Sequence, residues 1–231
     1  MSSSAVRVET WLKNAAVRAE ALTDVKIWGL ALVTGVATGY GVLAFSIAIE
    51  WVTEWAYGAP TAMLVDGARE LSRWRTFLVP VLGALVVAAA LAFSRRAGWV
   101  TDIRMQGVAE VIEARAKPPG AISFRSGLMN TGMAAVALGT GSSAGREGPA
   151  VLLGGAISVY LAKTFKLSAK DSRTLLGCAA AAAVSAAFNA PIAGVLFALE
   201  VVLSNYALSI FSPIALSSIA ATLISRAHLG D

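Results

Sequence analysis

Long tracts without a single charged residue dominate this sequence and restrict what it can fold into. Only 14% of its 231 residues are charged, whereas a soluble domain usually carries about 25%. Several tracts reach the roughly 20 residues that an α-helix needs to cross a bilayer. We therefore expect an all-α integral membrane protein with several crossings. The uncharged tracts cover residues 27–49, 76–94, 126–145, 148–162, 174–199 and 201–225.

One of these tracts, 148–162, is short for a membrane crossing and predicts a broken or partial helix. Non-helical backbone is tolerated at membrane depth only where protein or a watery cavity covers it. Pro118-Pro119-Gly120 marks a break between two helices. Small residues crowd 177–187, which favours close helix packing in lipid. The expected helices lie near 27–56, 75–95, 106–115, 123–139, 149–163, 169–186, 191–203 and 208–227.

The remaining charges predict how the chain is oriented. Basic residues precede the first crossing and follow the second, while the connection 50–73 between them is richer in acids. By the positive-inside rule, the N-terminus and segment 95–120 face the cytoplasm of a cell-membrane protein, and 50–73 faces outward. No basic patch is interleaved with aromatic residues, so binding of nucleic acid is a poor interpretation. The basic residues are Arg7, Lys13, Arg18 and Lys26, then Arg95, Arg96, Arg104, Arg115 and Lys117.

The first 25 residues differ from the rest. Val6, Trp11 and Leu12 share an apolar helical face with Ala16 and Leu22, which is typical of an amphipathic helix on a membrane surface. An ordinary solvated helix is the alternative. We therefore divide the chain into an N-terminal cytoplasmic segment, 1–25, and a transmembrane domain, 26–231.

The charged motif Gly145-Arg146-Glu147-Gly148-Pro149 interrupts the apolar sequence. Charges inside a membrane segment are costly and usually have a function. Glycines before Pro149 predict unwound backbone that becomes helical at the proline. The amino end of a helix offers bare N–H groups and a positive dipole, so this motif predicts an anion-binding site.

No pattern in the sequence indicates an enzyme. We find no Ser/His/Asp set, no cluster of metal ligands and no phosphate-binding loop. The lone Cys178 cannot form an intrachain disulfide, and its alanine-rich surroundings indicate a packing role. We expect no catalytic residue, metal site or cofactor.

Two motifs resemble markers of the CLC family of chloride channels and chloride/proton antiporters. Residues 138–149, Leu-Gly-Thr-Gly-Ser-Ser-Ala-Gly-Arg-Glu-Gly-Pro, look like its GREGP signature, and 187–194, Ala-Phe-Asn-Ala-Pro-Ile-Ala-Gly, are similar to its second marker. The resemblance covers about 27–228 and implies the first repeat of an inverted-repeat fold, with the second half absent. It implies chloride as the transported ion.

The resemblance assigns roles to individual residues. Glu147 matches the gating glutamate, whose carboxylate occupies an anion site and also takes up the proton in antiporters. The N–H groups of Arg146, Glu147 and Gly148 are expected to line the outer site. The alternative is a structural ion pair between Glu147 and Arg146.

The second anion motif of the family departs from its usual sequence here. The equivalent segment reads Met-Gln-Gly-Val-Ala-Glu over 105–110, with Gln106 in the position of the usual serine or histidine ligand, followed by Gly107. An amide N–H can donate to an anion, or Gln106 can face water and bind nothing. Val201 follows Glu200 where antiporters often carry a second acid, so channel and antiporter both stay open.

We expect transport of chloride through a voltage- or pH-gated channel or a proton-coupled antiporter. The alternative is a non-conducting half-transporter or assembly subunit, because the family's G-x-F-x-P segment and its chloride-coordinating tyrosine have no match here. A second repeat would then come from the rest of the gene product or from another chain. The resemblance further implies a homodimer in lipid through helices near 191–203 and 208–227. Its candidate contacts are Leu196, Leu199, Leu203, Ile210, Ile214 and Ile219, for which an orientation toward lipid is the alternative.

Overall fold

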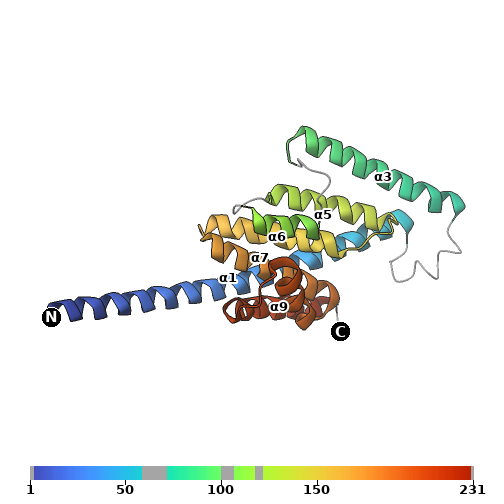
Figure 1. Cartoon of the computed structure of the whole chain (residues 1–231). Helices are drawn as coiled ribbons and strands as arrows, with labels where there is room; N and C mark the ends of the chain where they lie inside the picture. The colour runs from blue at the N-terminus through green and yellow to red at the C-terminus, as the bar shows by residue number, and fades with distance from the viewer. Residues whose placement is uncertain (1–2, 59–71, 100–106, 118–121, 230–231) are drawn as a thin grey trace.

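The computed structural model describes residues 3–58, 72–99, 107–117 and 122–229, with side chains from residue 25 onward. All regular structure in these ranges is helical, as predicted. Figure 1 shows the helices gathered into one bundle, from which the start of α1 projects. The elements are α1 (Ser3–Tyr57), α3 (Arg73–Arg96), α4 (Val108–Ala116), α5 (Phe124–Gly139), α6 (Glu147–Thr164), α7 (Ala169–Phe188), α8 (Pro191–Phe197), the π-helix η1 (Ala198–Leu203) and α9 (Leu208–Leu229).

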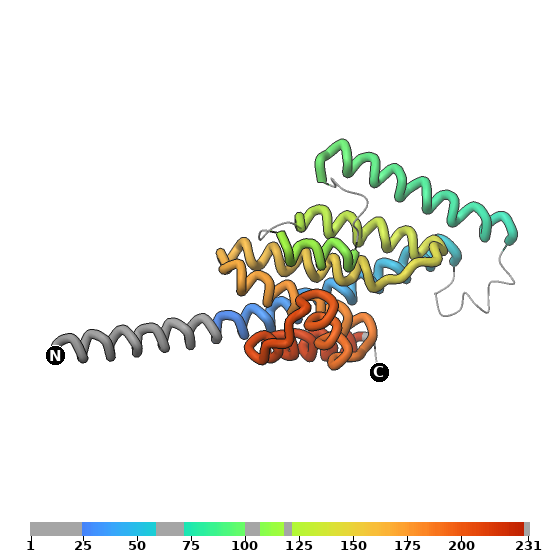
Figure 2. The backbone as a smooth tube through the Cα atoms, viewed as in Figure 1, coloured from blue at the N-terminus to red at the C-terminus, as the bar shows by residue number. Residues whose placement is uncertain are grey.

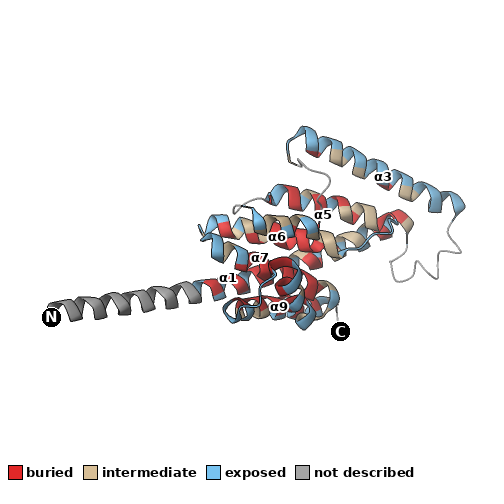
Figure 3. Ribbon diagram, viewed as in Figure 1, coloured by how far each residue is buried: buried red, intermediate tan, exposed pale blue. Residues whose placement is uncertain are grey.

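The helix α7 forms the centre of the bundle. Every residue from Thr174 to Ala186 is buried, and α1, α6, α8 and α9 all pack on this helix (Figure 3). Most of these residues are small, so neighbouring backbones approach closely. A Cβ added at Gly154 of α6 would lie 2.9 Å from the carbonyl oxygen of Ala179. The small-residue run predicted for tight packing is therefore the core.

Three helices of the described part are long and apolar enough to cross a membrane: Val25–Tyr57, Arg73–Arg96 and Leu208–His228. The tube in Figure 2 shows α3 running back against the direction of α1. The last turn of α1 and the first turn of α3 both lie at the end of the bundle far from the N-terminus. The alternation of sides expected from the charges agrees with this path, while the assignment of one side to the cytoplasm stays a prediction.

The boundary predicted between residues 25 and 26 lies inside α1, which is continuous from Ser3 to Tyr57. No break in the helix separates the two segments. The side chains of 1–24 lie outside the described ones, so an amphipathic surface role for this segment stays a prediction.

The helix expected at 191–203 changes type along its length. Pro191 begins α8 in a first-turn position that suits proline, and the π-helix η1 continues from Ala198 to Leu203. The segment ends at Ser204, whose φ of 44° is left-handed. A single π-helical turn inserted in a helix commonly marks a functional or packing irregularity.

Serine hydroxyls connect α7, α8 and α9. Ser185 and Ser218 share a hydrogen bond of 2.5 Å, and Ser218 Oγ donates to the carbonyl of Pro191 at 2.7 Å. Ser225 Oγ donates to the carbonyl of Ala186 at 2.9 Å. These bonds satisfy polar groups that would be costly in lipid and hold α8 and α9 on the core.

The residues expected at a dimer surface need correction. Leu199, Leu203, Ile210 and Ile214 are buried inside this chain, because they pack on α7 and its neighbours. Periodicity did not separate lipid-facing from core-facing positions, since both are apolar. Of the six candidates, Leu196 and Ile219 alone are exposed, each by half.

We predict that Gly35→Ala destabilises the bundle and Gly29→Ala does not. A Cβ at Gly35 would lie 2.8 Å from Cα of Ser217 in α9, whereas Gly29, on the same helix, has no neighbouring atom within 4 Å. Forced separation of packed helices typically costs about 1–3 kcal/mol, while alanine at an exposed helical position stabilises by up to about 1 kcal/mol. Thermal unfolding in detergent should show a lower midpoint for Gly35→Ala alone. Equal midpoints would contradict the α1–α9 contact.

Candidate anion-binding site

The amino ends of α4 and α6 meet backbone to backbone. Gly107 precedes α4, and Gly148 lies in the first turn of α6. A Cβ built on Gly107 would lie 3.1 Å from Cα of Gly148. Gly107 also has a φ of 90°, which side-chain-bearing residues rarely adopt. Glycine is therefore required here both for the turn and for the contact.

Neither helix end has a side-chain cap. No described side chain accepts a hydrogen bond from the first turn of α4 or of α6. The first N–H groups of a helix have no partner inside the helix. Two sets of unused donors and two positive dipole ends therefore converge on one place, and such a place attracts an anion.

The helix α6 begins two residues earlier than expected. The sequence predicted a start at Pro149, but the first helical residue is Glu147. The proline still occupies the first turn, where its missing N–H costs no hydrogen bond. As a result Glu147 is anchored by the helix itself, with its carboxylate at the positive end of the α6 dipole.

The side chain of Glu147 is half-buried and folds back over the preceding loop. Its Oε2 atom occupies the space that a side chain at Gly145 would need. No ion pair joins Glu147 to Arg146 among the described residues, where the Arg146 guanidinium bonds the carbonyl of Ala187 instead. The glycine at 145 therefore leaves room for a carboxylate beside the junction of α4 and α6.

The guanidinium of Arg146 contacts α7 and not Glu147. Its Nη2 donates to the carbonyl of Ala187 at 3.0 Å, in the last turn of α7, where a cation also offsets the negative end of the dipole. The side chain fastens the loop to the core. The backbone N–H of Arg146 remains next to the first turn of α6.

The other side of the loop is held by Tyr57 at the end of α1. Its hydroxyl donates to the carbonyl of Thr140 at 2.9 Å. The next residue, Gly141, adopts a φ of 97°. The N–H of Ser142 then donates to the carbonyl of Ala137, in the last turn of α5, at 2.9 Å. The loop that carries the charged motif is thus tied to α1, α5 and α7.

Sequence reasoning missed Asn130 of α5. It is 6% exposed and lines a cavity of about 240 Å³ together with Gly107, Pro149 and apolar residues of α3 and α5. Its Oδ1 atom has no hydrogen-bond partner among the described residues, which is unusual for a buried polar atom. The sequence feature that could have identified Asn130 is that it is the single amide side chain in the uncharged tract 126–145.

The structure brings together most of the predicted site residues. Gly107, the backbone of Arg146, Glu147 and Gly148 all lie at the junction. Gln106 lies outside the described residues, so its role as an anion ligand stays a prediction. Among the described residues, no three side chains of the metal-binding types cluster.

The comparisons with known proteins agree on one family. The model of the voltage gated chloride channel family matches residues 97–231. A ClcB-like chloride channel protein of Ralstonia nicotianae is 31% identical over 205 residues, which cover 87% of this chain and 46% of that protein. The voltage-gated ClC-type chloride channel ClcB of Escherichia coli is 30% identical over 200 residues, covering 85% and 46%. The chain spans about half the length of these relatives.

Two solved structures share the fold. A slow cyanobacterial Cl⁻/H⁺ antiporter matches with a TM-score of 0.70 and 23% identity, over 87% of this chain and 46% of that one. A eukaryotic CLC transporter matches with a TM-score of 0.67 and 20% identity, over 87% and 38%. The predicted all-α membrane fold, corresponding to part of a CLC protein, is confirmed.

We predict that Gly107→Ala disrupts the junction, with Gly132→Ala as the matched control. The new methyl group would press on Gly148 and force a non-glycine residue into a φ of 90°, a strain of about 1–3 kcal/mol. Gly132 lies on α5 with no neighbouring atom within 4 Å. Thermal unfolding in detergent should show a lower midpoint for Gly107→Ala and an unchanged or higher one for the control. An unchanged Gly107→Ala midpoint would mean that the two helix ends are not in contact.

Proposed function

Because the chain belongs to the voltage-gated chloride channel family, we propose that it builds one side of a chloride pathway, with the α4–α6 junction as an anion site and Glu147 as its gate. The observation that carries this proposal is the contact between two uncapped helix amino ends at Gly107 and Gly148. Each end carries roughly half a positive elementary charge. Two like ends held together in a low-dielectric medium are stabilised by an anion between them.

The carboxylate of Glu147 is itself an anion and competes with chloride for these donors. It is tethered to the first turn of α6 and half-buried, so it reaches the junction without crossing solvent. Protonation removes its charge and with it the competition. Displacement by chloride, or by a membrane potential acting on the charge, opens the site as well, since 100 mV acts on one charge with about 2.3 kcal/mol.

This gate serves a passive channel and a proton-coupled antiporter equally. In either case Glu147 couples anion access to its protonation. Gln106 is proposed to donate its amide N–H to the same anion from the amino side of α4. Arg146 contributes through its backbone N–H, while its guanidinium keeps the loop on α7.

Other helices are proposed to complete the pathway. The chain spans 46% of the ClcB-type relatives, and the contact at the junction is made by α4 and α6, with α3 and α5 lining the adjoining cavity. A second repeat, from the rest of the gene product or from another chain, would close the opposite side, and homodimerisation in the cell membrane would follow the family pattern. The second candidate function is a non-conducting assembly subunit, which would need a second repeat in order to conduct.

We predict that Glu147→Gln increases binding of chloride to the detergent-solubilised chain. Without the carboxylate, the backbone N–H groups of the junction are available to bind free chloride. The excess line width of ³⁵Cl NMR, which reports chloride in contact with protein, should rise several-fold. Acidification should raise the wild-type signal toward that of Glu147→Gln, whose own signal should not respond.

Glu200→Gln is the matched control, because Glu200 is an exposed acid in η1, an element that bonds α4 through Arg115 near the carboxyl end of that helix. It should leave the line width unchanged. If Glu147→Gln also leaves it unchanged, the anion site is absent and the assembly-subunit function stands.

We further predict that liposomes holding only this chain release chloride no faster than protein-free liposomes. The reason is that only one side of the pathway is present. A chloride electrode in the external buffer measures the efflux. Efflux above the protein-free rate, altered by Glu147→Gln but not by Glu200→Gln, would show that the chain conducts alone and would overturn the half-pathway proposal.

A further inference from the structure

Six basic side chains surround two adjoining cavities at the end of the bundle opposite the last turn of α1 and the first turn of α3. One cavity, of about 230 Å³, lies between α4, α6 and α7. The other, of about 420 Å³, lies between α4, α7 and the segment after η1. Arg173 lines both. The basic residues are Arg115, Lys117, Lys163, Lys166, Lys170 and Arg173; we call this the basic pocket.

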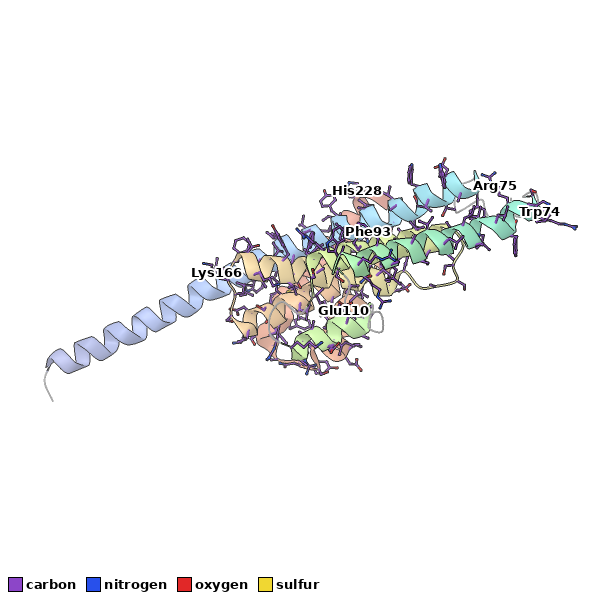
Figure 4. All side chains as sticks on the ribbon, turned by 90° about the horizontal axis from the view of Figure 1, so that it is seen from above. Trp74, Arg75, Phe93, Glu110, Lys166 and His228 are labelled. Carbon is purple, nitrogen blue, oxygen red and sulfur yellow. The ribbon has the colours of Figure 1, made fainter. Side chains whose placement is uncertain are left out.

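The basic pocket lies at the level where α1 enters the membrane. Lys26 Nζ donates to the carbonyl of Phe165 at 3.4 Å, and Lys26 stands at the start of the apolar part of α1, Val25–Tyr57. Figure 4 shows Lys166 at the same end of the molecule, next to α1. The turn from α6 to α7 is therefore at a membrane–water boundary.

Acidic groups offset only part of the positive charge at the cavities. No acidic residue is among the described residues that line either one. Glu113 pairs with Lys117 at 2.6 Å, and Asp171 is occupied by the hydroxyl of Ser168 at 2.8 Å in the cap of α7. Lys166, Lys170 and Arg173 thus line cavities whose described lining contains no carboxylate, and this arrangement favours a bound anion.

The backbone of Lys166 adopts a left-handed conformation that is unfavourable for a lysine. Its N–H bonds Lys163 at 3.2 Å, and the next N–H, of Leu167, bonds Ala162 at 2.9 Å. This is the Schellman ending of a helix, in which glycine usually takes the left-handed position. Lys166 takes it instead with a φ of 49°, at a cost of about 1–2 kcal/mol. A lysine that destabilises its own turn points to a function of its side chain.

The cavity between α6 and α7 also has an apolar wall and one unused hydroxyl. Val159, Ala162 and Leu176 form part of its lining. Ser172 lines it too, and its Oγ atom has no hydrogen-bond partner among the described residues. A ligand that fits has a phosphate for the cations and the hydroxyl, and hydrocarbon for the wall. Free phosphate satisfies only the first requirement.

We propose that the basic pocket binds the headgroup of an anionic phospholipid, with its phosphate among Lys166, Arg173 and Ser172 and its first acyl carbons against α6. Basic pockets between helices at a membrane face commonly bind such headgroups. This site is separate from the α4–α6 junction and does not depend on the proposed chloride pathway.

Native mass spectrometry of the full chain in detergent tests this proposal. The probes are dioleoyl phosphatidylglycerol and dioleoyl phosphatidylcholine, added at equal concentrations, and inorganic phosphate. The wild-type chain should retain phosphatidylglycerol preferentially. Arg173→Gln and Lys166→Gly should each weaken that retention about fivefold, as expected for one cation near a lipid surface. Arg96→Gln removes an exposed charge at the end of α3 outside the basic pocket and should have no effect.

The glycine variant separates ligand loss from unfolding. Lys166→Gly relieves the left-handed strain, so its thermal midpoint in lipid-free detergent should equal or exceed that of the wild-type chain. Equal retention of both lipids, or an equal loss with Arg96→Gln, would overturn the proposal in favour of diffuse surface charge. Displacement of the phosphatidylglycerol by millimolar inorganic phosphate would overturn it in favour of a soluble phosphate ligand.

Discussion

The contact between the amino ends of α4 and α6 is the constraint on which the remaining structure depends. Two positive dipole ends repel each other in a medium of low dielectric, so the contact of Gly107 with Gly148 requires both a scaffold and a counter-charge. Glu147 supplies a movable counter-charge from within the first turn of α6. In the proposed gate, a tethered carboxylate and a free halide are interchangeable occupants of the same environment.

The scaffold that maintains this contact is built from small residues and backbone-directed bonds. The alanine-rich α7 brings α6 close enough for Gly154 to lie against the carbonyl of Ala179. Arg146 and Tyr57 then fix the charged loop through the carbonyls of Ala187 and Thr140. None of these bonds uses the side chain of Glu147. The anchors of the loop therefore leave the proposed gating carboxylate without a hydrogen bond from either of these side chains.

The sequence predicted the bounds of the helices well, but it did not predict which faces of the helices pack against one another. Uncharged tracts, prolines and glycines mark helix ends locally, so most of the predicted helices lie within two residues of those observed. Whether Ile214 faces lipid, a second subunit or α7 depends on tertiary packing, and it is fully buried inside the chain. The charged motif could be identified as a candidate site from the sequence, because charged residues in an apolar segment are rare. Asn130 could not be identified in this way, because only the fold places it with Gly107 in one cavity.

The short helix α4 connects the two sites of this chain. Its amino end forms the junction at Gly107, and its carboxyl end carries Arg115 and Lys117 at the basic pocket. Nine residues at 1.5 Å per residue separate these ends by about 13 Å. Arg115 is fixed by a bond of 3.2 Å from its guanidinium to the carbonyl of Val202, so α4 is held at both ends. The two proposed sites therefore share one element of the scaffold while they use different residues of it.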